Sequence, residues 1–223
     1  MSAERPLRDR RETGFSLIET MRWEPAGGIV RRDLHMARLA GSAGALGFTF
    51  APQDTAWQLD TALENCTVPM RVRLDLAKDG RVSITTQPFN PLPADTLWRL
   101  RIASIRLDSA DPLLRHKTSR RAIYETARAE FSPGATDEVL LLNEKDEICE
   151  GTITSLFVEA QDGALLTPAL TSGLLDGVLR KELLLQGKVR EVILSVDDLF
   201  RARRIFVGNS LRGLIRARLP QLA

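Results

Sequence analysis

The sequence predicts an α+β protein with two domains. Residues 14–108 alternate strand-like segments with two helical patterns, whereas the chain beyond Asp111-Pro112 carries several short apolar strands with helices between them. We therefore expect a small N-terminal α+β domain over 1–110 and a C-terminal domain with a larger sheet over 111–223. No internal repeat is visible.

Composition restricts the classes of function. The chain has 223 residues, of which 43% are hydrophobic and 27% charged, and its net charge of +2 is too small to indicate a nucleic-acid or membrane partner. Cys66 and Cys149 lie far apart, so they predict neither a disulfide framework nor a metal site. The N-terminal segment is charged where a signal peptide needs an apolar run. We expect a cytoplasmic protein.

The N-terminal half opens with a predicted hairpin. Residues 14–23 (GFSLIETMRW) have the pattern of a strand, PAGG at 25–28 that of a turn, and Ile29-Val30 begin the return strand. Asp33 is then expected to cap a helix over 34–48, and Asp54 a second helix over 55–66.

Two further segments complete the expected N-terminal sheet. RVRLDL and RVSITT alternate polar and apolar residues around the turn Lys78-Asp79-Gly80, which is typical of a hairpin. After an interruption by prolines, residues 97–107 (LWRLRIASIRL) resume as a strand, which we assign to the same domain.

The C-terminal half is expected to begin with a helix over 120–131, capped by Thr118-Ser119 and ended by SPGATD. KDEICEG is expected to connect the first two of the strands that follow. The predicted strands cover 138–144, 153–160, 164–170, 189–195 and 204–210, and the predicted helices lie within 172–187 and 196–203.

Lys117 is the candidate for chemistry among the five lysines. Lys78, Lys145 and Lys188 lie in turn-like segments, and Lys181 lies on an expected helix surface. Lys117 has no such setting, although a solvated lysine is the commoner interpretation of any single lysine.

Two other features could form a site with Lys117. Glu150 is followed by Gly151-Thr152, and the loop SGLLDGVLR at 172–180 leads into a helix whose free N–H groups could hold a phosphate. A solvated turn acid and an ordinary helix start are the alternatives. A lysine, a buried acid and an anion site are what a pyridoxal-phosphate enzyme requires: an amine for the Schiff base and proton transfer, a carboxylate for the ring nitrogen, and an anchor for the phosphate.

A resemblance supports that interpretation. In order along nearly the whole chain, GFSLIETMRW, HMARLAGSA, HKTSRRAIY, NEKDEICEGTITSLF, LLTPALTSGLLDGVLR and FVGNSLRG resemble the class IV aminotransferases, the fold-type IV pyridoxal-phosphate enzymes. That family includes branched-chain and D-amino-acid aminotransferases and 4-amino-4-deoxychorismate lyase. The resemblance implies the two-domain fold of D-amino-acid aminotransferase, pyridoxal 5'-phosphate as cofactor, a small-molecule amino substrate and a homodimer.

The resemblance also assigns roles to particular residues. Lys117 resembles the Schiff-base lysine and Glu150 the glutamate that pairs with the pyridine nitrogen. Phosphate-binding positions, including backbone amides of a loop, are matched by Arg38, Gly177, Val178, Leu179 and Ser210. Substrate-facing positions are matched by Thr20, Arg22 and Leu211. For Arg38, Thr20 and Arg22, solvated side chains on a helix or strand are the alternative.

Some positions depart from the family pattern. Ser155 replaces the asparagine of the EGxxxN motif, and Ala122 stands where branched-chain aminotransferases have a tyrosine; Tyr124 is expected on another side of its helix. HKTSRR and NSLRG look more like the lyase members. The favoured expectation is therefore 4-amino-4-deoxychorismate lyase, which forms 4-aminobenzoate and pyruvate in folate synthesis.

Three alternatives stay open. The first is an aminotransferase for branched-chain or D-amino acids, because it shares the first half of the reaction. The second is a homologue that keeps the fold but has altered catalysis. The third is a nucleic-acid binder that uses the basic segments RDRR and RARR, although the single tyrosine leaves no aromatic platform for bases.

Overall fold

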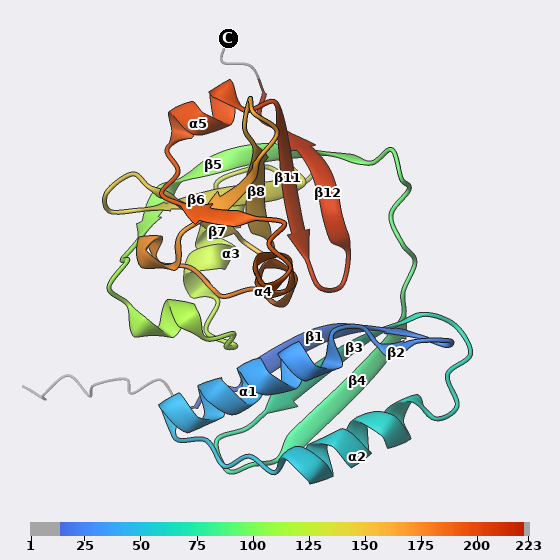
Figure 1. Cartoon of the computed structure of the whole chain (residues 1–223). Coiled ribbons are helices and arrows are strands. Elements are labelled where there is room, and N and C mark those ends of the chain that lie inside the picture. Colours follow the sequence, from blue (N-terminus) through green and yellow to red (C-terminus); the bar gives the residue numbers. More distant parts are fainter. Residues whose placement is uncertain (1–13, 221–223) are drawn as a thin grey trace, which may run out of the picture.

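The computed structural model describes residues 14–220 and has two lobes, each built around one β-sheet (Figure 1). The smaller lobe carries a four-stranded sheet and two helices, and the larger lobe an eight-stranded sheet with the remaining helices. The predicted α+β class is confirmed. The segment RDRR at 8–11 lies outside the described residues. Within residues 14–220, no helix is long and apolar enough to cross a membrane.

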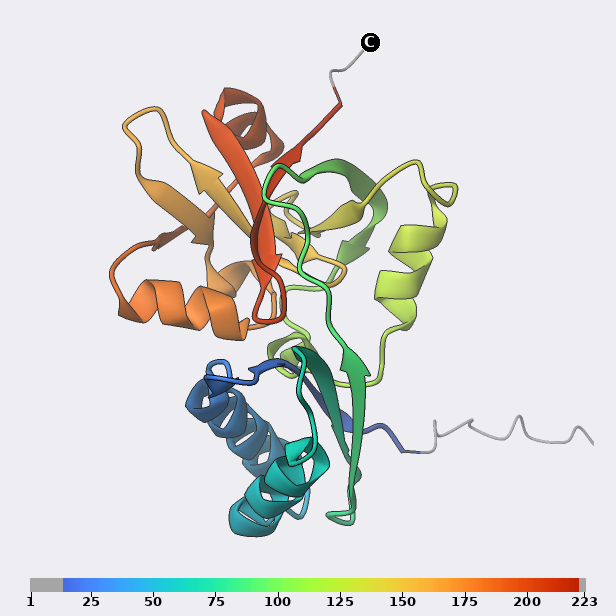
Figure 2. The ribbon, with the colours of Figure 1, turned by 90° about the vertical axis from the view of Figure 1, so that its right-hand side faces the viewer.

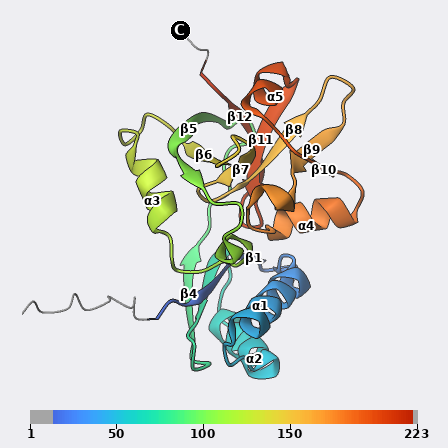
Figure 3. The ribbon, with the colours of Figure 1, turned by 90° about the vertical axis from the view of Figure 1, so that its left-hand side faces the viewer.

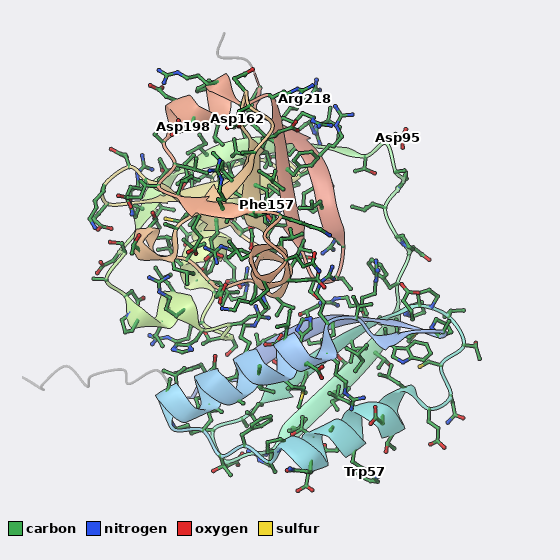
Figure 4. The ribbon with its side chains drawn as sticks, in the orientation of Figure 1. Trp57, Asp95, Phe157, Asp162, Asp198 and Arg218 are labelled. Atoms are coloured by element: carbon green, nitrogen blue, oxygen red, sulfur yellow. The ribbon has the colours of Figure 1, made fainter. Side chains whose placement is uncertain are left out.

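The smaller sheet is antiparallel and has the order β2-β1-β3-β4. Its inner face packs against two helices through a core that includes Met21, Leu39, Leu59 and Leu74. The outer face of α2 is open to solvent, where Trp57 is 69% exposed (Figure 4). The elements are β1 (Leu17–Glu24), β2 (Gly28–Ile29), α1 (Arg32–Leu46), α2 (Pro52–Leu63), β3 (Met70–Leu76) and β4 (Val82–Pro88).

Both predicted N-caps in this lobe are wrong. The residue before α1 is Arg31, which adopts a left-handed conformation with φ of 59°, and Asp33 lies inside the first turn. The residue before α2 is Ala51, followed by Pro52, and Asp54 also lies in the first turn. Proline is favoured at the first helical position because its missing N–H would have no partner there. The acidic residues instead face the positive end of the helix dipole.

The larger sheet is mixed and has the order β10-β9-β8-β11-β12-β5-β6-β7. It curls, so that β7 comes back beside β8. Phe157, fully buried in β8, marks its interior (Figure 4). The strands are β5 (Leu97–Leu107), β6 (Glu138–Asn143), β7 (Ile148–Gly151), β8 (Ser155–Glu159), β9 (Leu165–Pro168), β10 (Arg190–Val192), β11 (Arg204–Asn209) and β12 (Gly213–Arg218).

The sheet membership of β5 differs from the expectation. This strand pairs in parallel with β12 and with β6, so it belongs to the larger sheet and not to the N-terminal one. The segment 89–96, with Pro91 and Pro93, connects β4 of the small lobe to β5 of the larger one (Figure 2). The domain boundary near residue 110 stays a prediction, and we propose moving it into 89–96.

Short helices flank the larger sheet: η1 (Pro112–Arg115), α3 (Ala122–Ala129), η2 (Leu170–Ser172), α4 (Val178–Leu185) and α5 (Val196–Arg201). The helices α3 and α4 lie on opposite sides of the larger lobe (Figure 3). Thr118 and Ser119 do not cap α3, which begins after Arg121. Two strands were not predicted: β7, within the polar segment KDEICEG, and β12, which follows the strand expected to be the last.

The loop that carries Lys117 joins the two lobes. The backbone N–H of Ile18, in β1, donates to the Lys117 carbonyl at 2.8 Å. Next to it, the N–H of Ser119 donates to the Ser16 carbonyl at 2.9 Å, and the Ser119 hydroxyl accepts from the N–H of Ser16 at 2.9 Å. The smaller sheet therefore fixes the backbone of the predicted catalytic lysine.

Candidate active site

A large cavity lies where the two lobes meet, with a volume of about 1680 Å³. Its lining comes from β1, α1 and β3 of the smaller lobe and from the Lys117 loop, α3, β7, β8, α4 and the β11–β12 turn of the larger one. Eight of the ten residues singled out in the sequence line it: Thr20, Arg38, Lys117, Glu150, Gly177, Val178, Ser210 and Leu211. Segments far apart in the chain thus converge on one space.

Lys117 has an amine suited to chemistry near neutral pH. Burial lowers its pKa from 10.5 to about 8, and the positive charges of Arg38 and Arg121 act in the same direction against Glu19 and Glu150. A substantial fraction of the amine is therefore unprotonated at physiological pH. An unprotonated amine is the form that attacks a carbonyl group and accepts a proton.

Glu150 is buried at the cavity wall beside Tyr124. The Tyr124 hydroxyl donates to Glu150 Oε1 at 2.9 Å, and the backbone N–H of Leu175 donates to the same carboxylate. Burial nevertheless raises the pKa of Glu150 to about 7. Arg121 stacks over the Tyr124 ring at 4.8 Å. A cationic N–H group in the cavity would supply the charge that this buried carboxylate lacks.

The start of α4 forms the predicted anion-binding end of the cavity. Gly177 is the residue before the helix, and the first N–H groups that follow have no partner within the helix. A Cβ atom on Gly177 would lie 2.5 Å from the Ser155 hydroxyl, so only glycine fits there. Ser155, which replaces the family's asparagine, thus packs directly against this loop.

Arg38 and Ser210 are connected by a chain of buried hydrogen bonds. Arg38 donates to both oxygens of Glu19, at 2.8 and 2.6 Å. His35 Nδ1 lies 2.6 Å from Glu19 Oε2, and His35 Nε2 lies 2.7 Å from the Ser210 hydroxyl. Glu19 and His35 are only 2% and 1% exposed. These hydrogen bonds therefore fix the positions of the Arg38 guanidinium and the Ser210 hydroxyl, which both line the cavity.

The charges of Glu19 and His35 in this series of hydrogen bonds follow from burial and from their partners. Burial raises the pKa of Glu19, but Arg38 and His35 together lower it to about 2, so Glu19 is ionised. Burial lowers the pKa of His35 more than Glu19 raises it. A neutral His35 then carries its proton on Nδ1, toward the Glu19 carboxylate, and accepts at Nε2 from the Ser210 hydroxyl.

Two predicted residues do not join this group. Arg22 is outside the cavity lining and pairs with Glu24 at 3.1 Å. The Leu179 side chain packs in a hydrophobic cluster with Phe157, Leu183 and Val189, which leaves only its backbone amide near the start of α4. Their substrate and cofactor roles stay predictions.

Sequence reasoning missed three residues. Tyr124 was expected on another side of its helix and was given no role, yet its hydroxyl donates to Glu150. Glu19 and His35 were not selected at all, although Glu19 lies in a strand and His35 three positions before Arg38 on one helix face. The i, i+3 spacing of His35 and Arg38 was the available signal.

The cavity therefore fits an aromatic cofactor that carries a phosphate, a carbonyl group and a basic ring nitrogen. Arg38, Ser210 and the amides of Val178 and Leu179 provide donors or polar partners for the phosphate. Lys117 can condense with the carbonyl, and Glu150 can pair with a protonated ring nitrogen. These groups are the donor set that pyridoxal phosphate requires.

Comparison with known proteins is consistent with this donor set. The family model described as Amino-transferase class IV matches residues 16–219. A solved structure from Mesorhizobium loti, named "Putative amino-acid aminotransferase", is 55% identical with a TM-score of 0.90, over 92% of this chain and all of that one.

Two more relatives carry lyase names. The "Putative aminodeoxychorismate lyase" of Schizosaccharomyces pombe is 28% identical over 88% of this chain and 86% of its own. A structure from Legionella pneumophila named "Putative 4-amino-4-deoxychorismate lyase" is 25% identical with a TM-score of 0.79, over 98% of this chain and 88% of that one.

Proposed function

The chain belongs to the class IV aminotransferase family and is a pyridoxal-phosphate enzyme, and from that premise we propose that it is a 4-amino-4-deoxychorismate lyase. The reaction would release pyruvate and leave 4-aminobenzoate. The chemistry rests on the Lys117 amine, with a pKa of about 8, in one cavity with the buried Glu150 carboxylate and the α4 anion site. The observation that carries the choice of the lyase is a relative with a lyase name, which aligns over 88% of this chain.

Each residue has a distinct task in this proposal. When bound, the cofactor supplies an electron sink for the bonds that break. Lys117 holds the cofactor and then, as a free amine, moves the proton. Glu150 keeps the ring nitrogen protonated, and Tyr124 holds the Glu150 carboxylate in place. Arg38, Ser210 and the α4 amides bind the phosphate.

The lyase reaction is favoured by the relative from Schizosaccharomyces pombe. Its lyase name belongs to a protein that aligns over most of both chains, so the likeness covers both lobes and the cavity between them. Ala122, in place of the tyrosine of branched-chain aminotransferases, points the same way.

Amino-group transfer is the second candidate. It is favoured by the name of the Mesorhizobium loti protein, which is 55% identical to this chain. The site residues described above serve both reactions, since both begin by exchanging the lysine amine for the amine of the substrate.

A product assay on the purified holoenzyme separates the two candidates. Incubation with 4-amino-4-deoxychorismate is expected to give 4-aminobenzoate and pyruvate in equal amounts, and a panel of L- and D-amino acids with oxo acids little transfer. Transfer without 4-aminobenzoate would replace the first candidate by the second. Lys117→Ala should abolish either activity, whereas the matched variant Lys181→Ala, on the exposed side of α4, should not.

Two further expectations accompany this proposal. We infer a homodimer, because family members are usually dimers with the site near the interface, and a cytoplasmic location. Sedimentation of the holoenzyme tests the first and fractionation of the source cells the second.

A further inference from the structure

The cavity wall carries an excess of positive charge. The described residues that line it include seven lysines and arginines, but only three aspartates and glutamates. Such a lining favours anionic ligands. The proposed function uses Lys117 for the covalent bond with the cofactor and Arg38 for the cofactor phosphate, so the five other arginines need a separate explanation.

Most of the other cations already have partners. Arg73 donates to both oxygens of Asp75, at 2.7 and 2.6 Å, and Arg121 donates to the Thr152 carbonyl. Arg212 differs, because its guanidinium makes no hydrogen bond or ion pair with any residue in the described range 14–220. Arg71 has one neutral acceptor, Gln87 Oε1 at 3.2 Å.

Arg71 and Arg212 reach the cavity from different lobes. Arg71 lies on β3 of the smaller sheet, and Arg212 in the turn between β11 and β12 of the larger one. Both are partly buried. Contacts between the lobes bring the two elements together: the Arg31 guanidinium donates to the Ser210 carbonyl, in the same turn as Arg212, at 3.3 Å. The neighbouring Val30 N–H donates to the carbonyl of Arg22, which is the register partner of Arg71. Burial, and then the charge of Arg71, lower the pKa of Arg212.

The acid whose charge acts on Arg212, Glu138, does not neutralise this pair. Glu138 acts on Arg212 in the opposite direction, but its carboxylate is fully buried and accepts from Arg128, Thr152 and Thr154. Two like charges held together without a counter-ion are unfavourable for the fold. A bound anion would remove that repulsion.

The pair also lies away from the reacting amine. Lys117 contacts β1 at Ile18, the register partner of Asp75, whereas Arg71 lies four residues from Asp75 on β3, about 13 Å along the strand. An anion between Arg71 and Arg212 would therefore belong to a part of the substrate other than the one that reacts.

We propose that Arg71 and Arg212 together bind a substrate carboxylate remote from the reacting amino group, so that the enzyme selects substrates with two carboxylates. Guanidinium groups suit this role because each can donate two parallel hydrogen bonds to a carboxylate. The inference rests on the proposed function for the position of the reacting end. 4-Amino-4-deoxychorismate carries two carboxylates and meets the requirement.

A binding comparison on the holoenzyme tests this proposal without turnover. The probes are glutarate and pentanoate, which have five carbons each and differ by one carboxylate, and the readout is their Kd by titration calorimetry. Wild type should bind glutarate at least tenfold more tightly than pentanoate. Arg212→Gln and Arg71→Gln should each reduce that preference about tenfold, as expected for a charged hydrogen-bonded contact.

Arg216→Gln is the matched control, because Arg216 lies on the same hairpin but is exposed and outside the cavity lining. It should leave the preference unchanged. Equal affinity of wild type for the two acids, or an unchanged preference in Arg212→Gln, would overturn the proposal. Either outcome is independent of the reaction, whereas failure of the lyase proposal would appear only in the product assay.

Discussion

Replacing Glu19 by glutamine should destabilise the protein and remove part of its acid sensitivity. Glu19 is 2% exposed and accepts three hydrogen bonds, two from Arg38 and one from His35. Its pKa is about 2 in the folded chain against the usual 4.5, a difference that corresponds to about 3 kcal/mol of stability at neutral pH. Leaving Arg38 without its partner costs a similar amount, about 3–5 kcal/mol.

The sign of the pH dependence follows from the lowered pKa. Glu19 stabilises the folded state fully above pH 4.5, and this contribution falls as the pH drops toward 2, with about 2 kcal/mol lost by pH 3. Glu19→Gln should lack this part of the slope when urea unfolding of the apoprotein is measured from pH 7 to pH 3.

The matched control for this experiment is Glu64→Gln, an exposed residue next to α2. It should keep both the stability and the pH slope of wild type. A Glu19→Gln variant that unfolds at the wild-type urea concentration, with the wild-type pH dependence, would refute the claim that ionised Glu19 stabilises the fold through Arg38 and His35.

Three other predictions concern the cavity. Tyr124→Phe removes a hydrogen bond to Glu150 and should therefore raise the already elevated pKa of that carboxylate. As a result, kcat/KM should fall about tenfold or more, and the acidic limb of the pH profile of kcat should move to higher pH. An acidic limb at the wild-type pH would contradict the role of Tyr124. Gly177→Ala should weaken cofactor binding and lower the free energy of unfolding by about 1–3 kcal/mol, because its Cβ would meet Ser155. Cofactor titration and urea unfolding measure the two effects, and adding Ser155→Ala should restore part of both. The control Gly41→Ala, in open space on α1, should affect neither. Phosphate binding to the apoprotein should be accompanied by proton uptake at His35 near pH 7, because a protonated His35 would donate to the Ser210 hydroxyl and leave that hydroxyl free to donate to phosphate. Calorimetry in two buffers of different ionisation enthalpy measures this proton uptake. His35→Gln should abolish it.

Local patterns in the sequence were sufficient for most elements but not for their long-range pairing. The alternation in 71–76 and 81–86 predicted the hairpin of β3 and β4, because both strands and their turn are adjacent in the chain. The strand β5 was predicted correctly but placed in the wrong sheet, since its partners β6 and β12 are distant in sequence and parallel. No periodicity encodes such a partner.

The site residues also divide into those that local motifs predicted and those that depend on long-range packing. Lys117, Glu150 and Arg38 were found through motifs of a known family and converge on one cavity. Tyr124 was misjudged because its direction depends on where α3 begins and how it packs on β5 and β6, neither of which is a local property. The Arg71–Arg212 pair was not predicted because two residues on different sheets become neighbours only when the lobes meet.

The central claim is that Lys117 forms the covalent bond with the cofactor. Reduction of the holoenzyme with borohydride, followed by peptide mass mapping, makes that bond permanent and locates it. If Lys117 forms this bond, one modified lysine, Lys117, is expected among the five in the chain, and the label is lost in Lys117→Ala. Label on Lys78, Lys145, Lys181 or Lys188 instead, or a labelled Lys117→Ala protein, would contradict it.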